Sequence, residues 1–539
     1  MAGRKELPTV TVPQLHVHSA YSMRRGTSLP EFLARQAAKL GYTHLAITDR
    51  DGLWAVPRFV KSCRKEGITP LIGAQIAKPG NPRRRLILLT QNLDSFRRLS
   101  EIVSIMNLEK GGDGKDFDPV EQAERYADEG FVVMADLPEM LRELHGKISP
   151  GRLYGEITWG ERQITRRRFF GMLRMCRELE RPAVATGNVH MASKDEYLIH
   201  AVLTAMRTGR CLKDKIPVVD PSCFLQTPDE FEKPFIAQNV REALMNAREL
   251  AARCAWEWPE RKWLIPPPPD LPPGKRPIDE LRETVTPRLR RKYGKWTPEI
   301  KARLEKELEI IGEHGFANFF LIVADVVRES KRRGYRTLGR GSAGDSIISY
   351  GLDISQVDPI RYDLYFERFL NPERSSPPDI DLDFSWTHRD EMVQYVEERY
   401  GESKVASVGT IITLGLKSAF RETGKVLGYS NNEITRWSLY LPTWWDDSGD
   451  RLDEHPVTGE LPLNEEPLKT LLAVAKSIME LPVHQSVHVG GLVLSPEPIY
   501  RYAPLNRAAK GFVITQYDMR DCEEVGLIKL DLLSQRGLG

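Results

Sequence analysis

The sequence has few cysteines, no long apolar run and almost no net charge. Its six cysteines are scattered through 539 residues without any Cys-x-x-Cys pair, which disfavours a zinc–thiolate site and is typical of reduced thiols. No apolar run is long enough to cross a membrane. The first residues contain no apolar segment of the kind found in secretory signals. These absences predict a cytoplasmic protein without a membrane partner.

The composition allows several domains but does not indicate a function. A chain of 539 residues, 41% of them hydrophobic, can form three or four cores. The net charge of +2 does not require a nucleic-acid partner, and each local cluster of arginine and lysine is more typical of a solvated face than of phosphate contacts. The function must therefore be inferred from motifs.

Residues 377–384 read Pro-Pro-Asp-Ile-Asp-Leu-Asp-Phe and predict a strand with two unlike faces. Alternate residues of a strand share a face, so Asp379, Asp381 and Asp383 would form a row, and the apolar residues between and after them would enter a core. A row of carboxylates repels itself unless cations lie between them, which predicts a divalent-metal site. An EF-hand loop is disfavoured because its sixth position, which needs glycine, would be Phe384. A solvated acidic edge strand remains the plain alternative.

The first 200 or so residues alternate short apolar strands with amphipathic helices, which predicts an α/β layer or barrel. In such folds the chemistry lies at the carboxyl ends of the strands. Polar signals occur at four such places, namely His16-Val17-His18, Thr48-Asp49-Arg50, Gln75 and Asn188-Val189-His190. Two histidines on one strand face can bind a metal, although histidines buried for structural reasons are commoner.

Together these positions resemble the polymerase and histidinol phosphatase (PHP) domain, and the resemblance implies a site formed by His16, His18, Asp49, Glu156 and His190. Four positions depart from the family pattern. Arg25 and Arg50 stand where metal ligands are expected, and Gln75 and Asn188 replace an expected Glu and Asp. A guanidinium cannot ligate a metal and repels one. We therefore expect the PHP metal cluster to be absent or incomplete, and the domain to be structural rather than a phosphoesterase.

A proline-rich stretch marks the main boundary, because proline at the density found in residues 266–274 forms a stiff, extended connector. Helices resume at residue 298, after the predicted N-cap Thr297. The Gly-rich segment 338–346 is nearly a phosphate-binding P-loop, but Asp345 occupies the position of the lysine, so a P-loop is rejected. Ser342 and Asp345 are predicted to form a capping box, which would leave Arg340 free to contact phosphate.

Three motifs in this order resemble the bacterial C-family replicative DNA polymerases, that is, the alpha subunit of DNA polymerase III or its error-prone relatives. They are Gly-Arg-Gly-Ser at 339–342, Phe-Glu-Arg-Phe-Leu-Asn-Pro-Glu-Arg at 366–374 and Pro-Asp-x-Asp-x-Asp-Phe at 378–384, and a Lys-x-Asp strand at 529–531 fits the same pattern. The resemblance implies an α/β multidomain protein in which a PHP-type α/β barrel precedes a polymerase-beta-like nucleotidyltransferase palm (α+β) with an inserted helical thumb.

The resemblance also implies domain bounds. They are a PHP domain with its extension at 1–255, a proline-rich linker at 256–277, the first part of the palm at 278–404, the thumb at 405–483 and the second part of the palm at 484–539. The thumb is expected to be mostly helical from Val405 to Leu481, with an irregular acidic loop from Asp446 to Glu460. Lys404, Lys417, Arg421 and Lys425 are candidate phosphate contacts there, and an ordinary charged helix face is equally open for each.

The implied activity is DNA-directed DNA synthesis. Asp381, Asp383 and Asp531 would be the catalytic ligands of two Mg²⁺ ions, with Asp379 as a flanking carboxylate. The implied triphosphate contacts are Arg340, Gly341, Ser342, Lys529 and, more weakly, Arg368. His484 and His488 are not metal ligands in this family. Primer–template DNA and dNTP are the implied substrates, and a sliding clamp and an exonuclease subunit are implied partners of the full-length protein.

In the family, the fingers follow where this chain ends, eight residues after Asp531. Without them the site would keep its metal ligands but lack most of the surface that closes over the substrate, so we expect little polymerase activity from these residues alone. Two other functions remain open. One is a PHP-type metal-dependent phosphoesterase or 3′–5′ exonuclease, which the four replacements oppose. The other is a non-catalytic DNA-binding or scaffold fragment. The sequence does not separate a replicative from an error-prone role.

Overall fold

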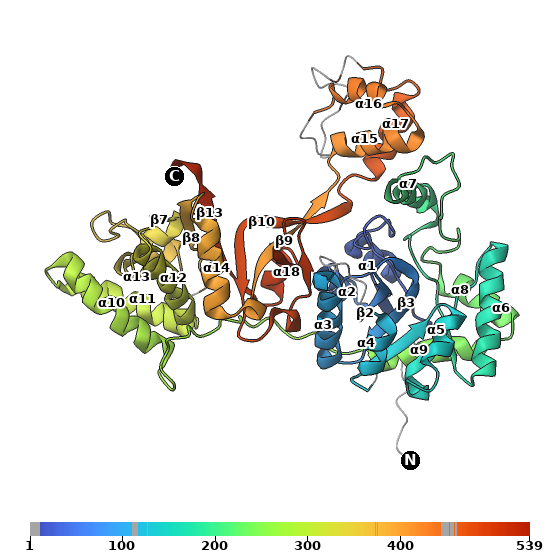
Figure 1. Ribbon diagram of the computed structural model, residues 1–539, viewed down its shortest axis with the longest axis horizontal. Coiled ribbons are helices and arrows are strands. Elements are labelled where there is room, and N and C mark those ends of the chain that lie inside the picture. The colour runs from blue at the N-terminus through green and yellow to red at the C-terminus, as the bar shows by residue number, and fades with distance from the viewer. Residues whose placement is uncertain are drawn as a thin grey trace. The chain divides into compact units, whose positions relative to one another are not determined.

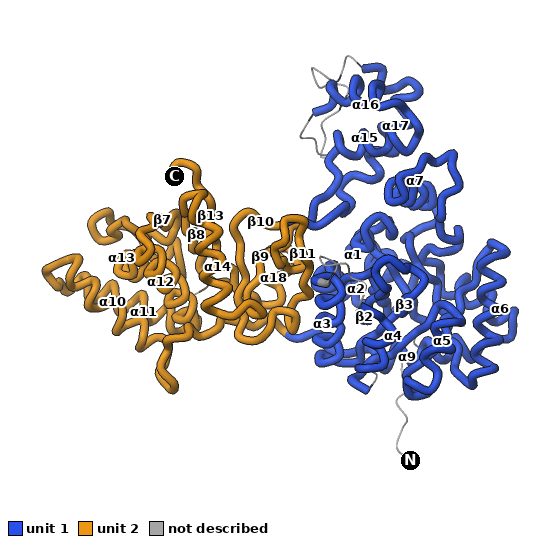
Figure 2. Tube along the Cα trace, in the orientation of Figure 1, with its two compact units in different colours: residues 1–259, 411–486 blue, residues 260–410, 487–539 orange. Residues whose placement is uncertain are grey.

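The protein divides into two compact units (Figure 2). Unit 1 comprises residues 1–259 and 411–486, and unit 2 comprises residues 260–410 and 487–539. Each unit has its own sheet. The chain first passes from unit 1 to unit 2 between residues 259 and 260, and it then leaves unit 2 and returns to it within two strands of the second sheet. The computed structural model describes residues 11–109, 117–126, 128–371, 373, 376–442, 452, 458 and 461–538.

The sheet of unit 1 has six strands in chain order, namely β1 (His44–Ile47), β2 (Thr69–Lys78), β3 (Asn81–Thr90), β4 (Phe131–Ala135), β5 (Leu153–Ile157) and β6 (Ala183–Ala185). Figure 1 labels β2 and β3 of this sheet. β1 and β2 are parallel, as are β4, β5 and β6, whereas β3 is antiparallel to both of its neighbours. The two-residue connection between β2 and β3 allows only a hairpin, since a parallel pair needs a long crossover.

Helices α1 to α9 alternate with these strands or follow them, which confirms the predicted α/β alternation. They are α1 (Pro30–Lys39), α2 (Val56–Glu66), α3 (Leu93–Glu109), α4 (Pro119–Arg125), α5 (Pro138–Leu144), α6 (Gln163–Glu178), α7 (Tyr197–Thr208), α8 (Pro228–Ala237) and α9 (Arg241–Cys254). The segment around residues 14–17 bridges both edges of the sheet, because Gln14 pairs with Leu45 in β1 and Val17 pairs with Val189 beyond β6. It thereby brings the ends of distant strands to one place.

A second helical part of unit 1 consists of α15 (Leu416–Leu427), α16 (Asn431–Ser438) and α17 (Leu468–Ser477). Its apolar side chains share one core with α7, in which Leu203 and Met206 join Phe420 and Leu471. The predicted acidic loop 446–460 lies outside the described residues except for Leu452 and Thr458.

The segment from Val405 to Leu481, which was expected to be mostly helical, contains these three helices but begins with a strand, because residues 405–413 form β9. The β-branched residues of this segment, which reads Val-Ala-Ser-Val-Gly-Thr-Ile-Ile-Thr, favour a strand over a helix.

The sheet of unit 2 has seven strands in the order β11-β12-β9-β10-β13-β8-β7. The strands are β7 (Thr337–Arg340), β8 (Asp381–Ser385), β9 (Val405–Thr413), β10 (Pro482–Leu494), β11 (Leu505–Arg507), β12 (Val513–Thr515) and β13 (Ile528–Gln535). The longer helices of this unit are α10 (Pro277–Tyr293), α11 (Pro298–Glu313), α12 (Ala317–Arg332) and α14 (Arg389–Tyr400), and two short ones are α13 (Ile347–Gly351) and α18 (Met519–Glu524).

The core of unit 2 lies between this sheet and helices α10 to α12. Ile380, Leu382 and Phe384 are all buried in it, which confirms the predicted apolar face of the acidic strand. The predicted N-cap is also confirmed, since the Thr297 side chain accepts a hydrogen bond from the Ile300 backbone N–H at the start of α11.

Within the described part of the chain, no single helix is long and apolar enough to cross a membrane. The bent pair α11 and α12 meets the length and composition test only when the two helices are taken together.

Candidate active site

Three neighbouring strands of unit 2 bring charged residues into one row. Asp381 on β8 pairs in register with Asp531 on the parallel strand β13 and with Arg340 on the antiparallel strand β7. Residues paired in register point to the same face of a sheet. The row therefore joins three segments that lie 41 to 191 residues apart in the sequence, and it forms directly from the strand pairing.

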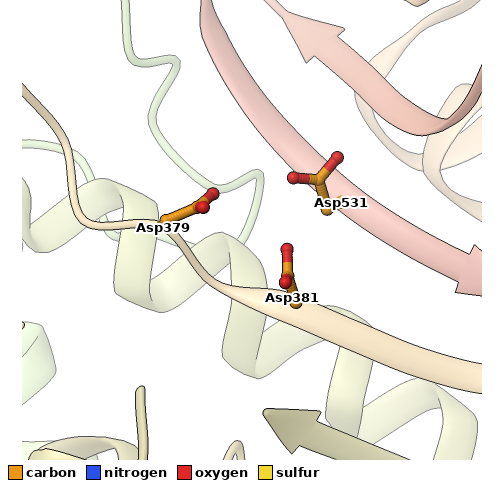
Figure 3. Close-up of side chains that lie close together, drawn as sticks. All are labelled: Asp379, Asp381 and Asp531. Carbon is orange, nitrogen blue, oxygen red and sulfur yellow. The ribbon is translucent and has the colours of Figure 1, made fainter. Parts of the chain in front are cut away.

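Three carboxylates meet at this row (Figure 3). One oxygen from each of Asp379, Asp381 and Asp531 lies within 4.8 Å of the others, and among the described residues these three form a group that could hold a metal ion. Asp381 lies on β8 and Asp531 on β13, while Asp379 belongs to the irregular segment before β8. Asp379 is exposed, and Asp531 is buried.

Lys529 partly neutralises this cluster. Its ammonium lies 2.6 Å from Asp531 Oδ2 and 3.7 Å from Asp379 Oδ1, which confirms that Lys529 and Asp531 share one strand face. Burial alone would lower the pKa of the Lys529 ammonium, but the hydrogen bond and the charge of Asp531 hold that pKa above its ordinary value. Burial raises the pKa of the Asp531 carboxyl, and Lys529 offsets this only in part.

The donor set fits a hard divalent cation. Asp531 Oδ1 is buried and has no hydrogen-bond partner among the described residues, and a buried carboxylate oxygen without a partner is costly. Two further carboxylates face it, and oxygen ligands are those that Mg²⁺ prefers. The cluster could therefore bind a metal ion.

Asp383 lies outside this group of three, although the sequence favoured it as a ligand over Asp379. Its Oδ1 accepts a hydrogen bond from Gln535 Nε2 at 3.2 Å and lies 3.7 Å from Arg340 Nε. Asp383 shares its strand face with Asp381, two residues earlier on β8. Asp379, in the irregular segment before β8, instead lies in the group with Asp531 and has its Oδ1 3.7 Å from Lys529 Nζ.

Arg340 is not free, contrary to expectation. Its Nε lies 3.3 Å from Asp381 Oδ2, because the β7–β8 register places the two residues opposite each other. Gly341 and Ser342 follow it in a short 3₁₀ turn, where Gly341 adopts a positive φ of 72°. Arg368 is largely exposed, with its Nε 4.0 Å from Asp345 Oδ2.

The predicted capping box of Ser342 and Asp345 was wrong. The N-cap of α13 is Ser346, whose side chain accepts a hydrogen bond from the Ser349 backbone N–H. Glu307 of α11 occupies the same helix start, where it accepts hydrogen bonds from Ser346 Oγ and from the backbone N–H groups of Ile347 and Ile348. A buried carboxylate therefore fills the place that a phosphate would take at this helix terminus.

Sequence reasoning did not find Glu307. It is fully buried, and its partner Arg303 stands one helical turn earlier, with Arg303 Nε 2.7 Å from Glu307 Oε1. Arg303 also donates to the backbone carbonyls of Asp345 and Leu364. The signal in the sequence was an acid on the apolar face of α11, at a spacing of three from Leu304 and four from Ile311.

The polar signals of unit 1 converge as the sequence predicted, but they bind one another. Arg50 Nη1 donates to Gln75 Oε1 at 2.8 Å, Gln75 Nε2 lies 3.3 Å from His16 Nε2, and His16 Nδ1 lies 2.7 Å from Glu156 Oε1. Both ring nitrogens of His16 are thus occupied by protein atoms. The replacements Arg50 and Gln75 fill the space between the expected ligands.

The remaining predicted residues of this cluster also have protein partners. His18 Nδ1 lies 3.0 Å from Ser22 Oγ, and His190 Nε2 lies 3.2 Å from Asn188 Oδ1. Asp49 accepts hydrogen bonds from Ser19 and Ser22, and burial raises its pKa to about 6. Burial, followed by neighbouring histidine and arginine charges, lowers the pKa of both His18 and His190 well below the ordinary value.

Acidification from about pH 7 to about pH 5 is expected to destabilise unit 1. Burial lowers the pKa of His18 and His190, and that of His200 to about 4. Below about pH 6.5 the unfolded state binds more protons at these histidines than the folded state, so each one removes about 1.4 kcal/mol of stability per pH unit. Asp49, with its raised pKa, acts in the opposite direction below pH 6 and offsets roughly one histidine.

Hydrogen exchange of the β4 and β5 peptides in EDTA at several pH values would measure this loss, because those strands report on unit 1 alone. His200→Gln is expected to reduce the pH dependence by about one proton. Protection that stays constant or increases between about pH 6.5 and pH 5 would contradict the expectation.

Comparisons with known proteins find relatives for two segments of the chain and for the chain as a whole. The family model described as "Bacterial DNA polymerase III alpha NTPase domain" matches residues 279–534, and the PHP domain model matches residues 14–162. The chain is 32% identical to the DNA polymerase III subunit alpha of Bacillus subtilis, over 97% of this chain and 48% of that protein. It is 32% identical to an error-prone DNA polymerase of Cutibacterium acnes, over 99% and 48%, and 31% identical to one of Mycobacterium tuberculosis, over 100% and 50%. The chain thus spans about half the length of the curated relatives it matches.

Proposed function

The chain belongs to the bacterial DNA polymerase III alpha family, and we propose that unit 2 is the nucleotidyl-transfer part of a DNA-directed DNA polymerase. The observation that carries this proposal is the register of β8 and β13, which sets Asp381 beside Asp531 within the part of the chain that matches the family's NTPase domain. Relatives named DNA polymerase III subunit alpha and error-prone DNA polymerase match at similar identity. We therefore propose template-directed DNA synthesis and assign neither a replicative nor an error-prone role.

In this proposal Asp381, Asp383 and Asp531 hold the catalytic metal ions, and Asp379 closes the cluster from the solvent side. Mg²⁺ bound there would activate the primer 3′-hydroxyl and neutralise charge on the departing pyrophosphate. The buried, unpartnered Oδ1 of Asp531 and the facing oxygens of Asp379 and Asp381 support this assignment. Asp383, two residues beyond Asp381, accepts a hydrogen bond from Gln535 and would have to give it up to join them.

Lys529 and Arg340 are proposed to exchange partners when substrate binds. Both now lie against the carboxylates, Lys529 at 2.6 Å from Asp531 and Arg340 at 3.3 Å from Asp381. Cations bound by the carboxylates would compete for the same oxygens and release both side chains toward a triphosphate. Gly341, Ser342 and the exposed Arg368 follow Arg340 in the chain and are the remaining proposed phosphate contacts.

The proposed substrates are primer–template DNA and dNTP, in the cytoplasm. We assign residues 278–404 and 484–539 to the palm, and residues 405–483 to the thumb, with β9 and β10 as the strands through which the chain leaves the palm and returns. A sliding clamp and an exonuclease subunit are the proposed partners of the longer protein.

Primer extension tests the proposal. The wild-type chain, given Mg²⁺, dNTP and a 5′-labelled primer on a template, is expected to add nucleotides at a low rate, and Asp381→Asn is expected to stop this addition while primer–template binding persists. A parallel reaction without dNTP measures shortening of the primer 3′ end. Shortening that survives Asp381→Asn and requires His16 would favour a phosphoesterase in unit 1. Primer–template binding with neither addition nor shortening would favour a non-catalytic scaffold and overturn the proposal for this chain.

A further inference from the structure

Unit 1 contains a cavity of about 590 Å³ beside the convergent histidines. Its volume is in the range of small-molecule sites. Seven arginine and lysine side chains line it but only three carboxylates do. Three of these cations, Arg25, Arg50 and Arg207, are at least half buried, so the excess positive charge is not simply on the solvated rim.

The three carboxylates of the cavity wall already have partners. Asp136 Oδ2 pairs with Arg85 Nε at 2.7 Å, and Glu156 pairs with His16 at 2.7 Å. Asp220 accepts hydrogen bonds from two backbone N–H groups, at Glu161 and Arg162, and from the Ser222 hydroxyl. None of the three forms an ion pair with Arg25, Arg50 or Arg207 in the described part of the chain.

The arginines consequently repel one another. Burial, and then the charges of Arg207 and Arg50, lower the pKa of Arg25 to about 10, and burial followed by the charge of Arg50 lowers that of Arg207. The Nε atom of Arg207 is buried without a hydrogen-bond partner among the described residues, whereas the Nε atom of Arg50 lies 3.3 Å from Asp51 Oδ1. A buried donor without an acceptor is costly, and so is the repulsion between neighbouring like charges, and an anion placed among the three arginines removes both costs.

We propose that this cavity binds a phosphate dianion, either free or as the phosphate group of a small phosphate ester, through Arg25, Arg50 and Arg207 and without a metal ion. A guanidinium presents a planar fork of donors that matches phosphate oxygens, and two negative charges suit a cluster of three cations. The same cations repel a divalent metal, and both nitrogens of His16 are occupied. The inference concerns unit 1 alone and does not depend on the polymerase site.

Equilibrium dialysis of the whole chain with ³²P-labelled inorganic phosphate, in EDTA and at constant ionic strength, tests this proposal. The wild type is expected to bind about one phosphate per chain, with a dissociation constant of roughly 1 mM or below. Arg25→Gln and Arg207→Gln are each expected to weaken binding at least tenfold, the equivalent of one charge-assisted hydrogen bond. Arg167→Gln is the matched control, because Arg167 is exposed on the same unit and does not line the cavity.

Thermal unfolding separates a binding role from a structural one. In phosphate-free buffer the two glutamine variants are expected to melt at or above the wild-type temperature, because each removes a like charge, and only the wild type and Arg167→Gln are expected to gain stability from phosphate. Deoxyadenosine monophosphate is then added as a competitor of the labelled phosphate. Displacement at a lower concentration than unlabelled phosphate needs would indicate a phosphate ester as the ligand, and weaker displacement would indicate free phosphate. Absence of binding, binding unchanged in both variants, or binding that requires added Mn²⁺ or Zn²⁺ would overturn the proposal.

Discussion

Replacing Asp531 with asparagine is expected to weaken Mn²⁺ binding to unit 2 by about 100-fold and to lower any primer extension by about 1,000-fold. The substitution keeps the shape of the side chain but removes the charge of the one buried carboxylate in the cluster. Metal ions supply several kcal/mol of charge stabilisation in such reactions, and about 4 kcal/mol corresponds to 1,000-fold in rate. Electron paramagnetic resonance of Mn²⁺ would measure binding, and single-turnover extension would measure the rate.

Asp379→Asn is the matched comparison, because Asp379 lies in the same cluster but is exposed. A solvated charge interacts weakly with its neighbours, so a loss of about tenfold or less is expected. Equal losses in the two variants would contradict the unequal roles assigned to these carboxylates. Retention of full Mn²⁺ binding in Asp531→Asn would mean that the cluster is not the metal site.

Replacing Glu307 with alanine is expected to destabilise unit 2 by about 3–5 kcal/mol, the usual cost of removing one partner of a buried ion pair. Glu307 is 0% exposed and accepts hydrogen bonds from Arg303, Ser346 and two backbone N–H groups of α13. The alanine variant leaves these donors buried without an acceptor. Urea unfolding would measure the change in the free energy of unfolding, and hydrogen exchange of the α11 and α12 peptides would assign that change to unit 2.

Glu305→Ala provides the control two residues away on the same helix. Glu305 is exposed and pairs with Arg282 at 2.6 Å, and exposed pairs contribute about 0.2–1 kcal/mol. If Glu305→Ala and Glu307→Ala lowered the stability equally, burial would not be the cause. The pKa of the Glu307 carboxyl is raised by burial, so Glu307→Gln is expected to cost less than alanine, because it keeps an acceptor in the same place.

Features set by local periodicity could be predicted from the sequence. The apolar face of β8, the shared face of Lys529 and Asp531, and the N-cap Thr297 each depend on residues within a few positions of one another. The alternation of strands and helices in unit 1 was predictable for the same reason. In each case the direction of a side chain follows from the repeat of the local strand or helix and does not depend on the packing of distant segments.

Features set by pairing between distant segments could not be predicted in this way. Arg340 was expected to be free, but the β7–β8 register places it against Asp381. Ser342 and Asp345 were expected to cap the helix that follows them, but Ser346 caps α13, and Glu307 reaches the same helix start from α11, 39 residues away from Ser346. Local motifs gave no information about these contacts, because register and helix packing decide which groups meet.

The histidine cluster of unit 1 shows a third limit. The sequence correctly indicated which positions would converge, and the replacements Arg50 and Gln75 were visible in it. It did not show that Arg50 would donate a hydrogen bond to Gln75, or that Gln75 and Glu156 would together occupy both ring nitrogens of His16. Nor did it identify Arg207, on α7, as a further cation of the same cavity, because no motif marks a single arginine on a helix.

The core shared by α7 and α15 to α17 also constrains how the protein is made. Leu203 and Met206 pack against Phe420 and Leu471, residues that leave the ribosome more than 200 positions later in the chain. At about 5–20 residues per second, roughly 10 to 50 seconds pass before this apolar face of α7 can be covered. During translation the apolar face of α7 therefore stays uncovered by these partners until α15 to α17 have been made.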